Sequence, residues 1–285
     1  MDFDGDGNLD ILSGCYWSDF FDETTSDGNP QAGYTLMLRG KGDLDFEAAV
    51  PLRDADGEPL TNVKLTKDKI ENYDSKTIVW QNICTAQHCI DYDGDGDFDI
   101  VNGCIRNEFF LHVNEADSPD SDPVFKNEGI ELPIKSPDQH SDPHLADFDG
   151  DGDLDLLTGG SSGGVFLSLN SGSRETPKWE SFECLVATQQ SFDPLGTTSS
   201  NAKPSRGSRV WTYDFNRDGK LDLLVGDSTE IVDPRPGTSA EEFAKEKAEF
   251  LKTHDQRSDY RRFYDERAEK FDVRKTGHIW LYLQK

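Results

Sequence analysis

The feature that most constrains this chain is an acidic phrase of nine residues that occurs four times. Its fullest copy spans residues 91–99, and the other copies begin at Asp2, Asp147 and Asp214. Each copy places oxygen-bearing side chains at positions one, three, five and nine and a glycine at position six, and an apolar stretch follows directly. A phrase repeated in this way predicts one supersecondary unit per copy.

The spacing of the carboxylates predicts a loop folded around a calcium ion. Calcium prefers oxygen ligands, commonly with a backbone carbonyl among them, and a glycine in the loop permits the sharp turn. Position seven therefore supplies its carbonyl, and the other positions supply side-chain oxygens. The predicted ligands are Asp2, Asp4, Asp6, Asn8 and Asp10 in the first loop; Asp91, Asp93, Asp95, Asp97 and Asp99 in the second; Asp147, Asp149, Asp151, Asp153 and Asp155 in the third; and Asp214, Asn216, Asp218, Lys220 and Asp222 in the fourth. We expect about one calcium ion per repeat, up to four in the chain.

An EF-hand is the obvious competing calcium motif, but its twelfth position is a glutamate and its flanks are helices. Here position twelve holds Ser13, Asn102, Thr158 or Val225, and the flanking residues are strand-like. An aspartate-rich turn that binds no metal is the other alternative. The fourth loop departs furthest from the pattern, because Asn216 replaces an aspartate and Arg217 replaces a glycine.

The third repeat displays the predicted unit most clearly. Short apolar runs at 143–146, 154–157, 165–169 and 182–187 are separated by the acidic loop and by turns rich in glycine, serine and asparagine. Such a pattern predicts four short strands that form a four-stranded antiparallel blade. Blades repeated along one chain predict an all-β fold, the β-propeller.

The repeats cover most of the chain, and we predict a single β-propeller domain over residues 1–285. The repeats lie near residues 1–53, 86–135, 140–190 and 206–285. The first has no strand before its loop and the last lacks a fourth strand, so both end blades are incomplete. We therefore expect native residues before Met1, with a signal peptide and further blades among them.

Two segments interrupt the repeats, an insertion at 54–85 and a helical segment at 238–272. In the helical segment, Ser239 and Glu242 have the spacing of a capping box, and apolar residues follow at helical intervals. We predict a helical hairpin inserted between the second and third strands of the last blade. It either covers apolar blade surface or serves as a docking element or lid for a partner.

The composition argues against several classes of function. Aspartate and glutamate number 56 against 29 lysines and arginines, which gives a formal charge of -27. So acidic a chain is a poor partner for nucleic acid or anionic membranes. Aromatic residues make up 11% of the chain, which is typical of a folded protein and not of a disordered acidic one. No apolar stretch is long enough to span a membrane.

The five cysteines do not have the spacing of a zinc site. Their odd number leaves at least one thiol without a disulfide partner in the chain. Cys15 and Cys104 occupy the same position in successive repeats, near Cys84, which favours disulfide pairing. Buried free thiols are the alternative.

The phrase Asp-x-Asp-Gly-Asp-Gly-x-x-Asp, with the apolar stretch after it, resembles the FG-GAP/VCBS repeat, the calcium-binding blade of integrin α-chain propellers and of many secreted bacterial proteins. The resemblance covers most of the chain outside the two interrupting segments. It implies a β-propeller with calcium between strands one and two of each blade, and an extracellular, cell-surface or periplasmic location. Family members serve in adhesion, in carbohydrate binding and as accessory domains of enzymes, so the family does not fix a function.

The same resemblance places the start of strand one on the face opposite the calcium loops, near the central channel. A polar ring that binds an acidic or hydroxylated ligand would there consist of His88, His140, His144, Arg206 and Arg209. Tyr16 and Trp17 would lie on the same face as a sugar-stacking platform. The alternatives are channel filling and solvated loops for the ring, and packing of a long loop for the aromatic pair.

Two functional hypotheses follow. The first is a secreted or cell-surface propeller that binds a protein or carbohydrate ligand, acts in adhesion or as an interaction scaffold, and uses calcium structurally. The alternative is a propeller enzyme, or an accessory subunit of one, that acts on polysaccharide at the channel face. The first is favoured, because the sequence has no evident nucleophile with its base, no phosphate loop and no paired acid and base carboxylates outside the metal loops.

Overall fold

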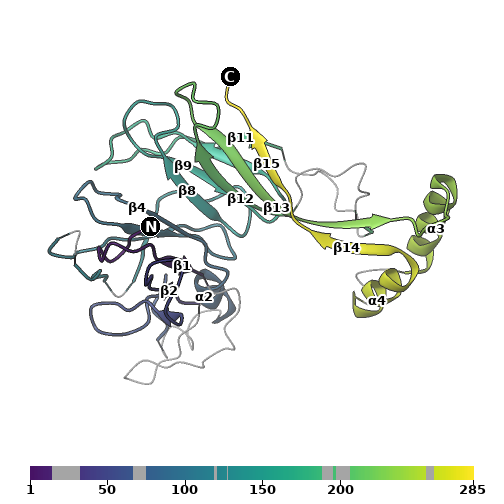
Figure 1. Ribbon diagram of the computed structural model, residues 1–285, viewed down its shortest axis with the longest axis horizontal. Helices are drawn as coiled ribbons and strands as arrows, with labels where there is room; N and C mark the ends of the chain where they lie inside the picture. Colours follow the sequence, from purple (N-terminus) through teal and green to yellow (C-terminus); the bar gives the residue numbers. More distant parts are fainter. Residues whose placement is uncertain are drawn as a thin grey trace.

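The computed structural model describes residues 1–14, 33–66, 75–118, 121–126, 128–187, 195–196, 206–254 and 260–285. Within these ranges the chain folds into four antiparallel sheets that follow one another in sequence order (Figure 1). The sheets are the blades of a four-blade β-propeller, and each contains one copy of the acidic phrase. The predicted all-β propeller fold is therefore confirmed.

The strands are short, as the spacing of the turns predicts. The first blade contains β1 (Ile11–Ser13), β2 (Leu36–Leu38) and β3 (Val50–Pro51). The second contains β4 (Gln87–Ile90), β5 (Asp99–Asn102), β6 (Phe110–His112) and β7 (Ile130–Glu131). The third contains β8 (Asp142–Ala146), β9 (Asp155–Gly159), β10 (Val165–Ser168) and β11 (Glu183–Val186). The fourth contains β12 (Arg206–Tyr213), β13 (Asp222–Asp233), β14 (Asp272–Thr276) and β15 (Ile279–Tyr282).

Successive blades pack face to face because side chains alternate along the strand that follows each acidic phrase. The first residue after the phrase faces the preceding blade, as in Ile100, Leu156 and Leu223. The second residue faces the following blade, as in Leu12, Val101 and Leu157. Each contact between neighbouring blades therefore has an apolar core of its own.

The long strand β13 pairs with three other strands. Its first half pairs with β12 and with β15, whereas Thr229–Asp233 pair with β14. The ribbon of β13 and β14 projects from the blade and carries α3 (Ala240–Thr253) and α4 (Tyr260–Lys270) at its tip (Figure 1). After the ribbon, β15 returns to the blade. The predicted helical hairpin in the last blade is thus confirmed.

A capping box and a buried core stabilise the hairpin. The Ser239 hydroxyl accepts the backbone N–H of Glu242 at 3.2 Å, and the Glu242 carboxylate accepts the N–H of Ser239 at 2.9 Å, which completes the capping box. The buried core of the hairpin consists of Leu195, Val232, Phe243, Phe250, Phe263 and Phe271. Arg267 of α4 donates to Glu230 of β13 at 2.8 Å. The aromatic faces of both helices therefore pack on one another and on the ribbon rather than on the blades.

Residues 54–85, which we predicted as an insertion, include the helix α2 (Ser75–Asn82). Val79 and Ile83 pack on Leu65 in a small core of their own.

No helix within the described ranges is long and apolar enough to cross a membrane. No disulfide joins the cysteines that the structure describes. Cys15 lies outside those residues, so a pairing that involves it stays a prediction.

Candidate metal loops and the inner-strand cluster

The acidic loops share one turn geometry. In the second, third and fourth blades the loop joins the first strand to the second, and the first loop leads into β1. The glycine at position six adopts the left-handed conformation, with φ of 100° at both Gly96 and Gly152, which a side chain would disfavour. Its N–H then points into the loop, where Gly152 donates to Asp147 Oδ2 at 3.1 Å. Gly219 donates to Asp214 Oδ2 at 2.9 Å in the same way, so the fourth loop keeps the turn.

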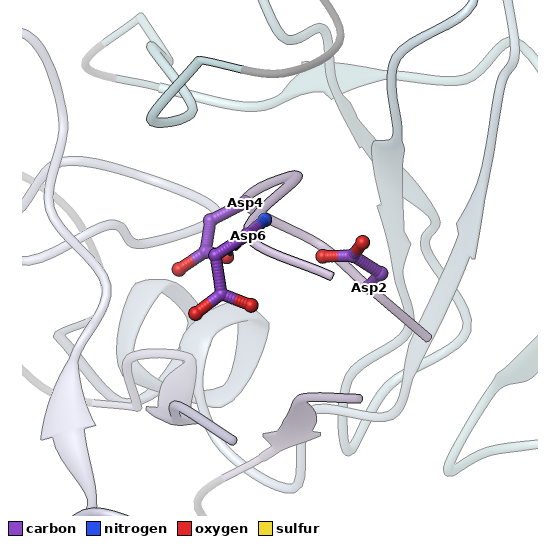
Figure 2. Close-up of side chains that lie close together, drawn as sticks. All are labelled: Asp2, Asp4 and Asp6. Carbon is purple, nitrogen blue, oxygen red and sulfur yellow. Dashed lines mark hydrogen bonds between the residues drawn. The ribbon is translucent and has the colours of Figure 1, made fainter. Parts of the chain in front are cut away.

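The first three loops bring carboxylate oxygens close together. The groups are Asp2, Asp4 and Asp6; Asp91, Asp93 and Asp99; and Asp147, Asp149 and Asp155. Within each group the candidate ligand atoms lie within 4.8 Å of one another. Figure 2 shows the first group, in which Asp2 faces Asp4 and Asp6 across the loop. All of these residues are among the predicted ligands, and a set of carboxylate oxygens at this separation has the chemistry that a hard cation requires.

The aspartate at position nine has a second role that the sequence did not predict. Asp99 Oδ2 accepts the N–H of Tyr92 in its own loop at 2.7 Å, and its Oδ1 accepts the N–H of Asn114 at 2.8 Å, just beyond β6. The same pair of bonds recurs at Asp10 with Phe3 and Gly40, at Asp155 with Phe148 and Asn170, and at Asp222 with Phe215 and Gln284. This buried carboxylate therefore ties each loop to the end of a neighbouring strand. The loop donors are aromatic in every blade, but the strand-end donors are Gly40, Asn114, Asn170 and Gln284, so no single residue type signals that second contact.

Asp97, at position seven of the second loop, is only 5% exposed. Its Oδ1 is buried and has no hydrogen-bond partner within the described residues. Burial, together with the nearby charges of Asp95 and Asp99, raises the pKa of Asp97 to about 7. Burial likewise raises the pKa of Asp99 to about 6. A buried, unpartnered carboxylate oxygen beside other acids fits a cation site, although the sequence pattern assigned only the Asp97 carbonyl to the metal.

Arginines from other parts of the chain contact two of the loops. Arg39 forms ion pairs with Asp4 of the first loop and, at 2.9 Å, with Asp122. Arg174 of the third blade donates to the backbone carbonyl of Tyr92 at 3.1 Å and lies 3.2 Å from the Asp91 carboxylate. These guanidinium groups offset part of the loops' negative charge, and the repeat pattern gave no indication of them.

The fourth loop differs in its ligand chemistry and its backbone. At position three the Asn216 amide donates to Asp218 at 2.9 Å, where the other loops have an aspartate. At position four Arg217 has φ of 61°. A residue with a side chain is strained in that left-handed region, which the glycines at position four of the other loops occupy without strain. The loop is therefore formed, but with one carboxylate fewer.

The inner strands of the blades bring the rings of His88, His144 and Trp211 into one cluster, in which His88 and Trp211 also lie near each other, with centroids 5.8 Å apart. The ring centroids of His88 and His144 lie 4.4 Å apart, and those of His144 and Trp211 lie 4.7 Å apart. His88 Nε2 donates to the Leu145 carbonyl at 3.1 Å, and His144 Nε2 accepts the Thr212 N–H at 3.2 Å. Burial lowers the pKa of His88 to about 4 and that of His144 to about 3. Both rings are therefore neutral and take part in the packing between blades.

A cavity of about 360 Å³ lies beside this cluster, and its lining includes Asp142, Arg209, Trp211 and Ile279. Arg209 Nη1 lies 3.4 Å from Asp142 Oδ1. Burial raises the pKa of Asp142 to about 6, although the guanidinium of Arg209 acts in the opposite direction. The cavity is thus polar at the ion pair and apolar at the tryptophan and isoleucine.

The structure brings together part of the predicted ligand ring. His88, His144 and Arg209 line the cavity. His140 is half-buried just before β8, and Arg206 is exposed at the start of β12. Tyr16 and Trp17 lie outside the described residues, so the sugar-stacking platform stays a prediction.

Comparison with known protein families supports the assignment of the repeat. Residues 147–225 match the family model of the FG-GAP-like repeat. This range runs from the first ligand position of the third loop to the core of β13 and includes the whole fourth loop. No curated protein matches the chain.

Proposed function

We propose that this FG-GAP repeat protein is a calcium-stabilised propeller that acts as an interaction scaffold outside the cytosol. The observation that carries the calcium proposal is the clustering of carboxylate oxygens in equivalent loops of successive blades. The buried, unpartnered Oδ1 of Asp97 adds support, because a cation would satisfy it. A fold built from repeated blades gives a rigid frame on which partner contacts can be carried.

The proposed calcium ligands are the side chains at positions one, three, five and nine of each loop, with the carbonyl at position seven. Asp97 adds its own carboxylate in the second loop. Two carboxylates about 4 Å apart repel each other by roughly 4 kcal/mol at an effective dielectric constant near 20. A bound divalent ion reverses that repulsion. The fourth loop binds calcium most weakly, because it has one carboxylate fewer.

The proposed calcium sites suit a protein that works outside the cytosol. Extracellular modules bind calcium with dissociation constants of about 10⁻⁴–10⁻³ M, which only an environment rich in calcium can saturate. We place the protein outside the cell, on its surface or in the periplasm. Strong acidity agrees with this role, since it disfavours nucleic acid and anionic membranes as partners.

The proposed partner is a protein or carbohydrate, and the helical hairpin offers a surface for it. The hairpin stands away from the blades on the ribbon of β13 and β14 (Figure 1), and its aromatic residues are used in its own core. Within the described residues the buried core of the hairpin is shared only with the ribbon and with Leu195. An element held out on a ribbon in this way is suited to contact another molecule. This favours the docking hypothesis over the covering hypothesis for the hairpin.

Thermal unfolding in EDTA and in excess calcium tests the proposal. Ligand at about 100 times its dissociation constant stabilises the folded state by roughly 2.7 kcal/mol per site, so several sites should raise Tm markedly. Asp93→Asn should remove part of that increase, whereas Glu47→Gln, at an exposed acid outside the loops, should leave it unchanged. Magnesium at the same concentration should stabilise less, because it gives up its water reluctantly. A melt that is the same in EDTA and in calcium would refute the calcium proposal.

A further inference from the structure

Residues 170–179, which join β10 to β11 in the third blade, reach back to the acidic loop of the second blade. We call this connection the strap. Arg174 of the strap donates through Nε to the Tyr92 carbonyl at 3.1 Å and through Nη2 to the Asp91 carbonyl. Its Nη2 also lies 3.2 Å from Asp91 Oδ1. The third blade therefore places a guanidinium group against the first two positions of the second loop.

The strap holds Arg174 in a defined position. Asn170 closes the strap at its base, because its Oδ1 accepts the N–H of Gly172 at 2.9 Å and that of Lys178 at 2.7 Å. The N–H of Asn170 is in turn bonded to Asp155 of the third loop at 2.8 Å. The side chain of Arg174 is 34% exposed, so most of it is packed and its contact is more than a solvated surface pair.

The second blade makes a similar contact with the first loop. Asn114 begins the connection from β6 to β7 as Asn170 begins the strap, and its Oδ1 likewise accepts two backbone N–H groups. Asp122 of that connection accepts a hydrogen bond from Arg39 at 2.9 Å, and Arg39 pairs with Asp4 of the first loop. In both places the following blade fixes an arginine against the acidic loop of the blade before it.

The third loop shows that an arginine is not needed to shape the turn. Gly150 donates to Asp147 Oδ1 at 2.8 Å, as Gly94 donates to Asp91 Oδ1 at 2.6 Å. Within the described residues the third loop forms this turn without a guanidinium contact of the kind that Arg174 makes. Because the turn is the same in both loops, the main effect of Arg174 on a bound cation is the repulsion between like charges.

We infer that Arg174 is an internal counter-ion of the second loop, which lowers the calcium affinity of that loop and whose own contact is weakened by calcium. The inference rests on the proposed binding of calcium. In the metal-free protein the guanidinium offsets part of the charge of the five aspartates of the loop. A bound divalent ion removes that attraction, so the strap is held less firmly.

The two effects are reciprocal. The factor by which Arg174 lowers the calcium affinity equals the factor by which calcium weakens the contact of Arg174 with the loop. The calcium concentration therefore governs how firmly the strap joins the third blade to the second. The second loop is then a calcium-sensitive contact between blades as well as a candidate metal site.

Calorimetric titration of wild type and Arg174→Gln with calcium tests the inference. We expect one site whose Kd is roughly three- to tenfold lower in the variant, as befits a partly exposed charge in salt. Lys178→Gln is the matched control, because it removes the same charge from an exposed position of the same strap, and its Kd values should match those of wild type. Arg174→Lys keeps the charge and should also bind calcium as the wild type does, although it loses the planar fork that reaches both carbonyls.

Urea unfolding provides a readout that does not depend on the titration. Arg174→Gln should be less stable than wild type in EDTA, and its deficit should shrink in saturating calcium by the factor that separates the two Kd values. An equal deficit in EDTA and in calcium would contradict the inference. Weaker calcium binding by Arg174→Gln would also overturn it, because the guanidinium would then orient the ligands and not oppose the ion.

The outcome for the wild type separates this inference from the proposal on which it rests. If the melting of the wild type does not respond to calcium, the calcium proposal itself fails, and the inference fails with it. If the wild type binds calcium and Arg174→Gln binds it with the same affinity, the calcium proposal stands and the role of Arg174 is disproved.

Discussion

Asp155 and Asn170 are joined by a hydrogen bond of 2.8 Å from the Asn170 backbone N–H to Oδ1 of the carboxylate. The other oxygen of Asp155 accepts the N–H of Phe148 inside the acidic loop. Each blade repeats this arrangement at position nine. The last acid of the phrase is therefore an anchor that positions the loop on its blade, in addition to being a candidate metal ligand.

Asp155→Asn should destabilise the protein even in EDTA. One amide oxygen replaces two carboxylate oxygens, so one buried N–H loses its acceptor, at a cost of about 1–3 kcal/mol. Asp151→Asn is the matched control, because Asp151 is exposed at position five of the same loop. Urea unfolding should show a loss for Asp155→Asn with and without calcium, and for Asp151→Asn only with calcium. Equal effects of the two variants in EDTA would contradict the anchoring role.

Arg39→Gln should tighten calcium binding in the first loop. The guanidinium of Arg39 pairs with Asp4, whose side chain is a candidate ligand, and so competes electrostatically with a cation. The same change should destabilise the protein in EDTA, because Asp4 is then buried without its partner. Calorimetric titration with calcium would show the change in affinity at this one site. Lys41→Gln removes an exposed charge nearby, from a pair with Asp45, and should leave the calcium affinity close to that of the wild type.

The inner-strand histidines should make the protein sensitive to acid. Burial lowers the pKa of His88 to about 4 and of His144 to about 3, well below the ordinary value of about 6.5. Their stabilising contribution is therefore complete above pH 6.5 and is lost as the pH falls toward those values. Between pH 6.5 and its own lowered pKa, each of the two histidines should reduce the free energy of unfolding by roughly 1.4 kcal/mol per pH unit.

Comparison of wild type with His144→Gln isolates this effect. Asp142 has a raised pKa of about 6 and changes stability in the opposite direction over the same pH range, but it is common to both proteins. Denaturant unfolding from pH 7 to pH 4 should give a shallower loss of stability for the variant. Parallel pH profiles would show that His144 does not carry the acid sensitivity.

Arg217→Gly should stabilise the fourth loop. Arg217 has φ of 61°, a conformation that glycine adopts without strain. Relief of that strain is worth about 1 kcal/mol, less the greater entropy of glycine in the unfolded chain. Arg217→Lys retains both the charge and the strained backbone, and it should show no gain. Thermal melts in EDTA measure the effect without a contribution from metal.

The acidic phrase predicted the blades because its residues are contiguous in the sequence and the next strand of the blade always follows it directly. The same is true of the hairpin, whose capping box and apolar spacing are encoded within a few residues. Contacts between distant residues were not predictable in this way. The bond from Asp99 to Asn114 and the pair of Arg39 with Asp4 join segments whose separation varies from repeat to repeat.

The cluster of His88, His144 and Trp211 illustrates the same limit. The sequence identified the two histidines as polar residues on the inner strands, but their function as ligand residues could not be separated from packing. Their burial depends on the blade that follows, and a single repeat contains no information about its neighbour. Trp211 was not among the predicted site residues, because its contacts with His88 and His144 come from other blades.

The twelve residues of β13 run through the blade and on into the ribbon that holds the helices. A pull on the helices along this strand would load its hydrogen bonds to β12 and β15 together, in shear, and would not open them one at a time. Tension applied at the hairpin would thus reach the most strongly paired strand of the last blade. A partner bound to the hairpin would therefore transmit force directly to the strand that has the most hydrogen bonds in the last blade.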